Sequence, residues 1–141
     1  MRFWDSSALV PLLLLEPASG TARDRYLEDP EVAVAWTTAI ECASPIARLE
    51  REGHLGPRET AQAFARLDGL AATWNVVEPR DETLEVARRL LRVHPLRAAD
   101  ALQLAAAFLA AERRPATLAF VTRDERLRAA AEREGFEVIA L

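Results

Sequence analysis

Five short strand-like segments alternate with longer helical patterns along the chain, and this alternation restricts the fold more than any other feature. The strand candidates are Arg2–Trp4, Glu31–Trp36, Asn75–Val77, Leu118–Val121 and Glu137–Ile139. Four of them centre on adjacent apolar residues, which is typical of strands buried on both faces of a parallel sheet. The helical patterns lie at Ser6–Leu15, Thr21–Leu27, Thr38–Glu52, Arg58–Thr73, Glu82–Val93, Ala98–Arg113 and Asp124–Glu134. The alternation predicts a doubly wound α/β sandwich with right-handed crossovers.

One continuous domain over residues 1–141 is the simplest organisation. The length lies near the usual size of a domain, and 50% of the residues are hydrophobic while 28% are charged. No repeat, low-complexity run or Gly/Ser-rich linker interrupts the sequence. Pro57 and Pro95 stand just before helical patterns, and Gly53 and Gly135 stand where C-terminal caps are expected.

All eighteen positively charged side chains are arginines, because the sequence contains no lysine. This excludes sites that depend on a P-loop lysine or a Schiff-base lysine. Only His54 and His94 are present, without an H-E-x-x-H motif, so a histidine-rich zinc site is not favoured. Cys42 is the single cysteine and cannot form an internal disulfide or a cysteine-ligated cluster. Any chemistry must therefore use mainly carboxylates, hydroxyls and arginines.

The net charge of -4 argues against the broadly basic surface that many nucleic-acid-binding proteins carry, although it leaves nucleic acid open as a substrate. The apolar segment Ala8–Leu15 follows Arg2, so a secretory signal has to be considered. It contains Pro11, is too short to span a bilayer and is preceded by Asp5. We therefore expect a strand followed by a buried helix, in a cytoplasmic protein that does not enter the membrane.

Four acidic residues stand at or near the starts of predicted helices, and each also has a purely structural explanation. They are Asp5, Glu41, Asp100 and Asp124. Asp5 follows the first strand candidate and could cap the next helix. Thr38 and Glu41 have the spacing of a capping box, in which the glutamate would accept a hydrogen bond from the threonine amide. Thr122 and Glu125 could form a second capping box, with Asp124 as a favourable first-turn charge.

Asp100 is the residue whose surroundings most favour a functional interpretation. Leu104, Ala107 and Phe108 follow at helical spacing, so the carboxylate shares a stripe with side chains that should face the core. A negative charge near a helix start is favoured by the helix dipole, which is the structural alternative. A buried carboxylate is costly without a partner such as a cation.

In a parallel α/β sheet the four acidic residues would all lie at the edge formed by the carboxyl ends of the strands, where such sheets place their binding sites. Carboxylates gathered there either take up protons or bind a divalent cation. Oxygen ligands without histidine or thiolate favour Mg²⁺ or Mn²⁺. Such an ion is suited to phosphate chemistry, so hydrolysis of phosphodiesters is the leading hypothesis.

The same motifs resemble the PIN-domain family, and within it the VapC-like toxin ribonucleases of toxin–antitoxin pairs. Phe3-Trp4-Asp5-Ser6-Ser7-Ala8-Leu9-Val10, followed by Leu15-Glu16-Pro17, is similar to the first strand and helix of that family. Thr38-Ala-Ile-Glu41 is similar to its second acidic motif. Ala99-Asp100-Ala101-Leu102-Gln103-Leu104-Ala105-Ala106-Ala107 resembles the third and most distinctive motif, and Val121-Thr122-Arg123-Asp124 the fourth. The resemblance covers nearly the whole chain.

The resemblance implies a PIN-like three-layer sandwich and endonucleolytic cleavage of RNA. It assigns Asp5, Glu41, Asp100 and Asp124 to a Mg²⁺ or Mn²⁺ site, which Thr122 could support with its hydroxyl. We expect Asp5 and Asp100 to be the chief ligands, with the other two carboxylates completing the site or receiving the proton of the attacking water. A homodimer and a cognate antitoxin protein are also implied by the resemblance.

The expected contacts to substrate depart from the family pattern. Pro11 stands where many relatives have a basic residue, and phosphate contacts must come from arginines, of which Arg97, Arg123 and Arg126 lie nearest the site in sequence. Ordinary solvated helix surface is the alternative for all three. The leucines at Leu12–Leu15 occupy consecutive positions, so they predict a helix that is fully buried or partly covered by another subunit.

Two other functions compete with the ribonuclease. In the first, the fold is a catalytically silent protein-interaction module, and the four acidic residues serve only as helix caps. In the second, the protein is a phosphatase of the haloacid-dehalogenase type. That chemistry usually requires a D-x-D motif and a lysine, whereas this sequence reads Asp5-Ser6-Ser7 and has no lysine.

Overall fold

The computed structural model describes residues 1–141 and confirms the α/β fold, with five parallel strands and seven α-helices. The strands are β1 (Arg2–Trp4), β2 (Val32–Ala35), β3 (Asn75–Val77), β4 (Ala119–Thr122) and β5 (Val138–Ala140). The helices are α1 (Ser6–Leu13), α2 (Ser19–Glu28), α3 (Thr38–Arg51), α4 (Pro57–Ala71), α5 (Asp81–Val93), α6 (Ala98–Ala110) and α7 (Glu125–Glu134), with a short 3₁₀ helix at Pro115–Thr117. All five strand candidates form strands, with bounds that differ by at most one residue at either end.

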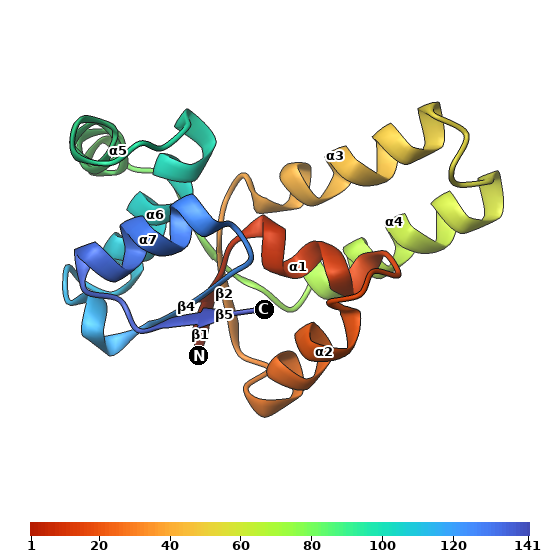
Figure 1. Cartoon of the computed structure of the whole chain (residues 1–141), viewed down its shortest axis with the longest axis horizontal. Coiled ribbons are helices and arrows are strands. Elements are labelled where there is room, and N and C mark those ends of the chain that lie inside the picture. The colour runs from red at the N-terminus through yellow and green to blue at the C-terminus, as the bar shows by residue number, and fades with distance from the viewer.

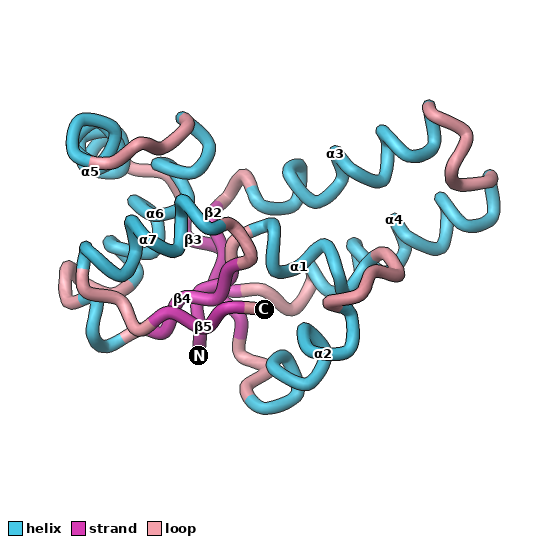
Figure 2. Tube along the Cα trace, viewed as in Figure 1, coloured by secondary structure: helices cyan, strands magenta, loops and turns pink.

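The molecule has three layers because successive side chains of each strand point to opposite faces of the sheet. Phe3 and Ala35 face a core shared with α5, α6 and α7. Trp4 and Val34 face a second core, shared with α1, α3 and α4. In Figures 1 and 2 the helix pair α3 and α4 extends away from the sheet as an arm. None of the helices is both long enough and apolar enough to cross a membrane.

The strand order places β1 at the centre of the sheet, in the sequence β3-β2-β1-β4-β5. The chain winds outward from β1 through β2 to β3, and then returns to the other side of β1 with β4 and β5. The order therefore reverses between β1 and β4, whose register pairs Trp4 with Val121. Parallel sheets bind ligands in the crevice outside the carboxyl ends of strands at such a reversal.

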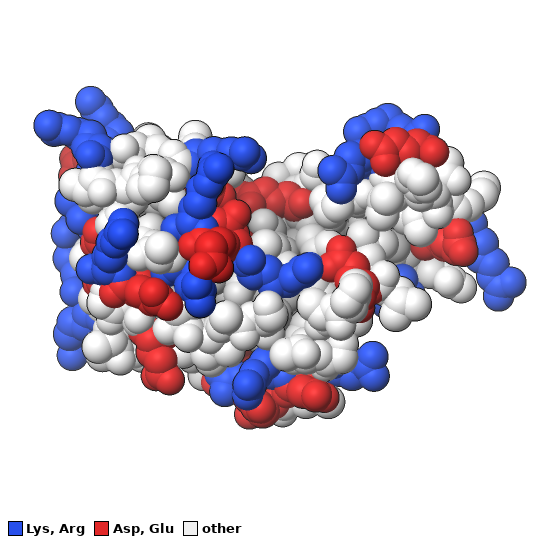
Figure 3. Space-filling view, viewed as in Figure 1, with Lys and Arg blue, Asp and Glu red and all other residues white.

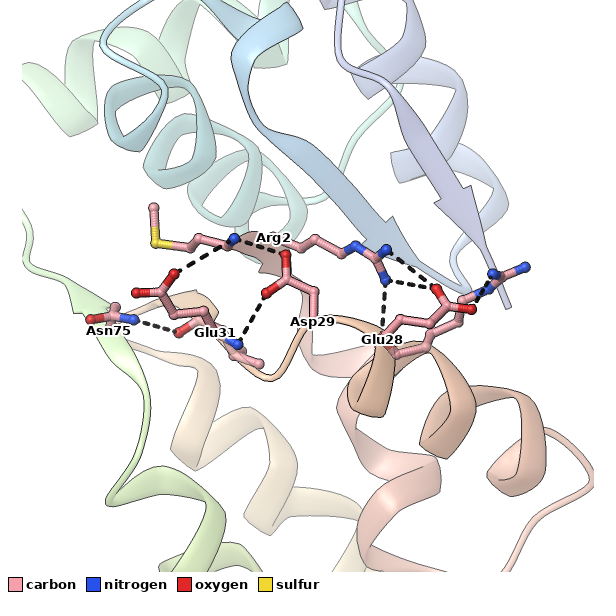
Figure 4. A network of polar contacts seen from close by, with 8 residues as sticks. Arg2, Glu28, Asp29, Glu31 and Asn75 are labelled. Atoms are coloured by element: carbon pink, nitrogen blue, oxygen red, sulfur yellow. Dashed lines mark hydrogen bonds and ion pairs between the residues drawn. The ribbon is translucent and has the colours of Figure 1, made fainter.

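The opposite edge of the sheet, at the amino ends of the strands, carries charges that are paired. The ammonium group of Met1 lies 2.8 Å from a carboxylate oxygen of Asp29. The Arg2 guanidinium lies 3.2 Å from the Glu28 carboxylate and also donates to the carbonyl of Arg25. Figure 4 shows this network, in which each carboxylate is in contact with a cation or a backbone amide. It ties the start of β1 to the end of α2.

Helix α1 ends at Leu13, two residues before the predicted end, because side chains from elsewhere bind its last carbonyl groups. The Arg66 guanidinium donates two hydrogen bonds to the carbonyl of Leu13, at 3.0 and 2.8 Å. The Ser19 hydroxyl donates to the carbonyl of Leu14. Leu13 and Leu14 are buried, whereas Leu15 is 97% exposed. Full burial of the leucine run is therefore wrong, and its cover by another subunit stays a prediction.

Helix α6 ends at Ala110, three residues before the predicted end. Glu112 and Arg113 have φ values of 50° and 60°, a left-handed conformation that no α-helix can contain. The turn directs the chain through the 3₁₀ helix into β4. Nothing in the sequence indicated this turn, because neither of the two residues is a glycine.

The C-terminal cap of α7 gives a prediction about stability. Gly135 has φ 96°, so alanine there should lower the free energy of unfolding by about 1–2 kcal/mol. Gly69 lies inside α4, and a Cβ there would meet no atom within 4 Å. Alanine at Gly69 should raise the free energy of unfolding by roughly 0.5–1 kcal/mol, because glycine loses more backbone entropy on folding. Urea unfolding of both variants measures the two changes in the free energy of unfolding. Changes of the same sign would contradict the left-handed cap at Gly135 or the helical position of Gly69.

Candidate functional site

Asp5 lies directly after β1 and begins α1, where its carboxylate is held by the next turn. One oxygen accepts from the Ser7 amide at 3.0 Å, and the other accepts from the Ser7 hydroxyl at 2.9 Å. The residue is only 4% exposed, and this burial raises the pKa of the Asp5 carboxyl to about 6. Hydrogen bonds from Ser7 and Thr122 oppose the rise, and the nearby charge of Asp124 adds to it. Asp5 is thus both a helix cap and a buried acid.

Glu41 is held by two hydroxyl groups from different helix starts. The Ser6 hydroxyl donates to one carboxylate oxygen at 2.8 Å, and the Thr37 hydroxyl donates to the other at 2.6 Å. The predicted capping box between Thr38 and Glu41 is wrong, because the N-cap is Thr37 and the carboxylate points toward α1 instead. The Thr38 hydroxyl is buried and forms a hydrogen bond with Gln103 at 3.0 Å. This bond connects the start of α3 to α6.

Asp100 stands in the first turn of α6, where one carboxylate oxygen accepts from the Arg97 amide at 3.2 Å. The side chain is half-buried rather than buried, while Leu104 and Ala107 on the same stripe are fully buried. Partial burial raises the pKa of the Asp100 carboxyl, and the charges of Asp124 and Glu41 raise it further. The amide and the guanidinium of Arg97 act in the opposite direction.

Asp124 is the N-cap of α7, and its carboxylate accepts from the Leu127 amide at 2.8 Å. The predicted capping box between Thr122 and Glu125 is wrong for that reason. Thr122 ends β4 instead, and its buried hydroxyl accepts from the Asp124 amide at 3.0 Å. The same hydroxyl lies 3.4 Å from the Ser7 hydroxyl, so Thr122 joins the Asp5 and Asp124 positions.

The four acidic residues therefore gather at the predicted edge of the sheet. Their mutual effects on pKa link them: Asp124 acts on Asp5 and on Asp100, and Glu41 acts on Asp100. None of the four forms an ion pair, in contrast to the carboxylates at the amino edge. Figure 3 shows acidic side chains in the hollow between the arm of α3 and α4 and the helices α6 and α7. A pocket of about 320 Å³ opens beside Asp100 and Asp124.

These residues fit a hard divalent cation in donor type and in charge. All the acidic groups offer oxygen ligands. The pKa values of Asp5 and Asp100 are raised chiefly by burial and further by neighbouring carboxylates, and a bound cation would favour the charged forms. No three carboxylate, imidazole or thiolate groups lie close enough in this conformation to hold a metal ion. The donor set thus fits the ion, whereas the present side-chain positions do not enclose it.

The hydroxyl side chains of Ser6, Ser7 and Thr37 form part of the site. The sequence predicted Ser6 and Ser7 only as neighbours of Asp5, and it did not predict a role for Thr37. Ser7 also accepts from the Arg123 amide at 2.9 Å, so it joins α1 to the turn after β4. The dipeptides Ser6-Ser7 and Thr37-Thr38, each at the end of a strand, are the signal that could have indicated them. Their hydrogen bonds fix the orientation of the carboxylates.

Comparison with known proteins adds an independent line of evidence. A family model described as the PIN domain matches residues 2–133. PAE2754 from Pyrobaculum aerophilum is 25% identical, with a TM-score of 0.59 over 92% of this chain and 83% of its own. FitAcB from Neisseria gonorrhoeae is 18% identical, with a TM-score of 0.67 over 99% and 96% of the two chains. A toxin–antitoxin complex from Klebsiella pneumoniae contains a chain 17% identical, with a TM-score of 0.64 over 99% and 97%. No curated protein matches the sequence.

Proposed function

The chain belongs to the PIN-domain family, and on that basis we propose that it is a Mg²⁺- or Mn²⁺-dependent endoribonuclease that hydrolyses phosphodiester bonds in RNA. One observation carries the proposal. Four carboxylates lie at the carboxyl edge of the sheet without an ion pair, although the chain carries eighteen arginines and two of them, Arg97 and Arg126, border the pocket beside Asp100 and Asp124. Folding alone does not favour such a concentration of charge, whereas binding of a divalent cation compensates it.

We assign Asp5 and Asp100 as the chief ligands, and Glu41 and Asp124 as additional ligands or proton acceptors. When bound, a divalent cation would supply Lewis-acid chemistry by neutralising charge that develops on the phosphoryl oxygens. Glu41 has the geometry of a positioned base, because two hydroxyls fix both of its carboxylate oxygens. The Ser7 hydroxyl orients Asp5, and Thr122 fixes the backbone that carries Asp124.

We further propose that the protein is the VapC-like toxin of a toxin–antitoxin pair, acts in the cytoplasm as a homodimer and is inhibited by a cognate antitoxin. The fold supports this role, since a chain of a toxin–antitoxin complex from Klebsiella pneumoniae covers nearly the whole domain.

The test is cleavage of a mixed panel of structured RNAs by metal-stripped protein, before and after Mg²⁺ or Mn²⁺ is restored. We expect cuts within the RNA chain only with the metal present. The Asp5→Ala variant should make no cuts while it keeps the folded circular dichroism spectrum. Assays with DNA of the same sequence and with a small phosphomonoester determine the class of substrate. Faster turnover of the phosphomonoester than of RNA would favour a phosphatase over the ribonuclease.

A non-catalytic interaction module is the second candidate, and a specific observation favours it. Asp5, Asp100 and Asp124 each accept a hydrogen bond from a backbone amide at a helix start, as helix caps do. Caps alone predict neither metal binding nor cleavage. Absence of both in calorimetry and in the RNA assay would support this module and reject the nuclease.

A further inference from the structure

Two arginines border the pocket beside Asp100 and Asp124. Arg97 directly precedes α6, and Arg126 lies in the first turn of α7. The pocket is lined by Arg97, Asp100, Asp124, Glu125 and Arg126, and therefore only by charged residues. The acidic edge of the sheet thus has a basic border on the side formed by α6 and α7.

The arginines near the acidic edge differ in whether their charge is already paired. The Arg123 guanidinium lies 2.5 Å from the Glu16 carboxylate, and Arg128 is paired with Glu125. Arg97 and Arg126 are exposed and form no ion pair, although both border a pocket that contains carboxylates. Their guanidinium groups are therefore available to an anion that enters the pocket.

We propose that Arg97 and Arg126 are positioning residues that bind backbone phosphates of the RNA next to the bond that is cut. The inference rests on the proposed function, and it separates this pair from Arg123, whose charge is already paired with Glu16. A phosphate in the pocket would lie beside Asp100 and Asp124 and between cations from two helices. Arginine suits this role, because its planar guanidinium can donate two parallel hydrogen bonds to a phosphate.

The charge of the whole protein gives such a pair of arginines a clear role. The chain carries a net charge of -4, and RNA approaching the four carboxylates meets like charge. Phosphate contacts supply most of the affinity of proteins for nucleic acid without regard to sequence. In the absence of lysine, cationic contacts to phosphate at this site come from arginines, and among Arg97, Arg123, Arg126 and Arg128 only Arg97 and Arg126 form no ion pair.

The test measures RNA binding and cleavage in separate assays. Binding of a fluorescent single-stranded RNA is followed by anisotropy in an Asp5→Asn background, which is not expected to cut the probe. Arg97→Gln and Arg126→Gln are compared with Arg123→Gln and with Arg58→Gln, an exposed arginine in the first turn of α4. Cleavage kinetics and Mn²⁺ affinity are then measured for the same substitutions with Asp5 intact.

We expect Arg97→Gln and Arg126→Gln each to raise the Kd for RNA about tenfold, since each removes a charge-assisted hydrogen-bond donor. The slope of log Kd against log salt should fall by about one for each arginine. In cleavage, KM should rise with little change in kcat, and Mn²⁺ affinity should stay the same. Arg58→Gln should leave binding within about twofold, and Arg123→Gln should have a smaller effect than either pocket arginine.

Equal losses in all four variants, or none in the pocket variants, would overturn the proposal. Failure of the proposed function gives a different result. Wild-type protein that binds RNA through Arg97 and Arg126 but never cuts it would reject the ribonuclease and keep the phosphate contacts. Protein that cuts RNA with unchanged KM in both pocket variants would keep the ribonuclease and reject the phosphate contacts, and protein that neither binds nor cuts RNA would reject both.

Discussion

Substitution of Asp100 by asparagine is expected to lower RNA cleavage on the order of a hundredfold or more and to abolish stabilisation by Mn²⁺. The half-buried carboxylate is influenced by Asp124 and Glu41, so it lies within the field of the other acids. Asparagine keeps the size of the side chain and an oxygen that can accept from the Arg97 amide. Single-turnover cleavage and a thermal shift titration with Mn²⁺ measure the two losses.

Glu59 provides a control that matches the structural role of Asp100. It stands in the first turn of α4, a helix that carries none of the four acidic residues, and accepts a hydrogen bond from the Gly56 amide at 2.8 Å. If helix capping were the only role of Asp100, Glu59→Gln and Asp100→Asn would both cost at most ~1 kcal/mol of stability and nothing else. Cleavage by Asp100→Asn at the rate of Glu59→Gln would therefore reject Asp100 as a ligand.

Substitution of Asp5 by asparagine is expected to make the metal-free protein more stable at pH 7.5, even though it should abolish activity. Burial raises the pKa of the Asp5 carboxyl from 3.8 to about 6, so above that pH the folded state holds a charge that burial disfavours. A difference of about two pKa units corresponds to roughly 3 kcal/mol as an upper limit. Neutral asparagine removes this cost and retains the cap.

The direction of the pH dependence follows from the raised pKa. The folded protein binds a proton at Asp5 more tightly than the unfolded chain does. The contribution of this proton to the stability of the folded state is therefore fully present below pH 3.8. It is lost as the pH rises from about 4 through about 6. Urea unfolding in EDTA at several pH values should show wild type losing stability relative to Asp5→Asn across this window. A constant difference between the two proteins would contradict the raised pKa.

The order of elements could be predicted from the sequence, because hydrophobic runs and helical periodicity are local signals. The ends of helices could not be predicted where contacts with distant residues determine them. Arg66 is 53 positions from the Leu13 carbonyl that it binds, and no local pattern contains that contact. Trp74 is 8% exposed, as the general tendency of aromatic residues to be buried suggests, whereas Trp36 is only partly buried against the core.

The acidic positions were predictable for a similar reason, while their hydrogen-bond partners were not. Asp5, Glu41 and Asp124 follow strands whose carboxyl ends must meet at one edge of a parallel sheet, and Asp100 begins the helix that covers it. Spacing suggested a local capping box for Glu41. The hydroxyls of Ser6 and Thr37 bind that carboxylate instead. Ser6 is 35 residues away and reaches it because the fold brings α1 against α3.

Three backbone amides are directed at the acidic edge and can serve as spectroscopic probes of it. The amides of Ser7, Arg97 and Leu127 donate to Asp5, Asp100 and Asp124 respectively. An amide resonance responds to the charge of the carboxylate that it donates to, so three peaks in a ¹⁵N-labelled sample would follow three acids one by one. Titration with protons or cations could then be resolved residue by residue, without substitution of any of the three aspartates.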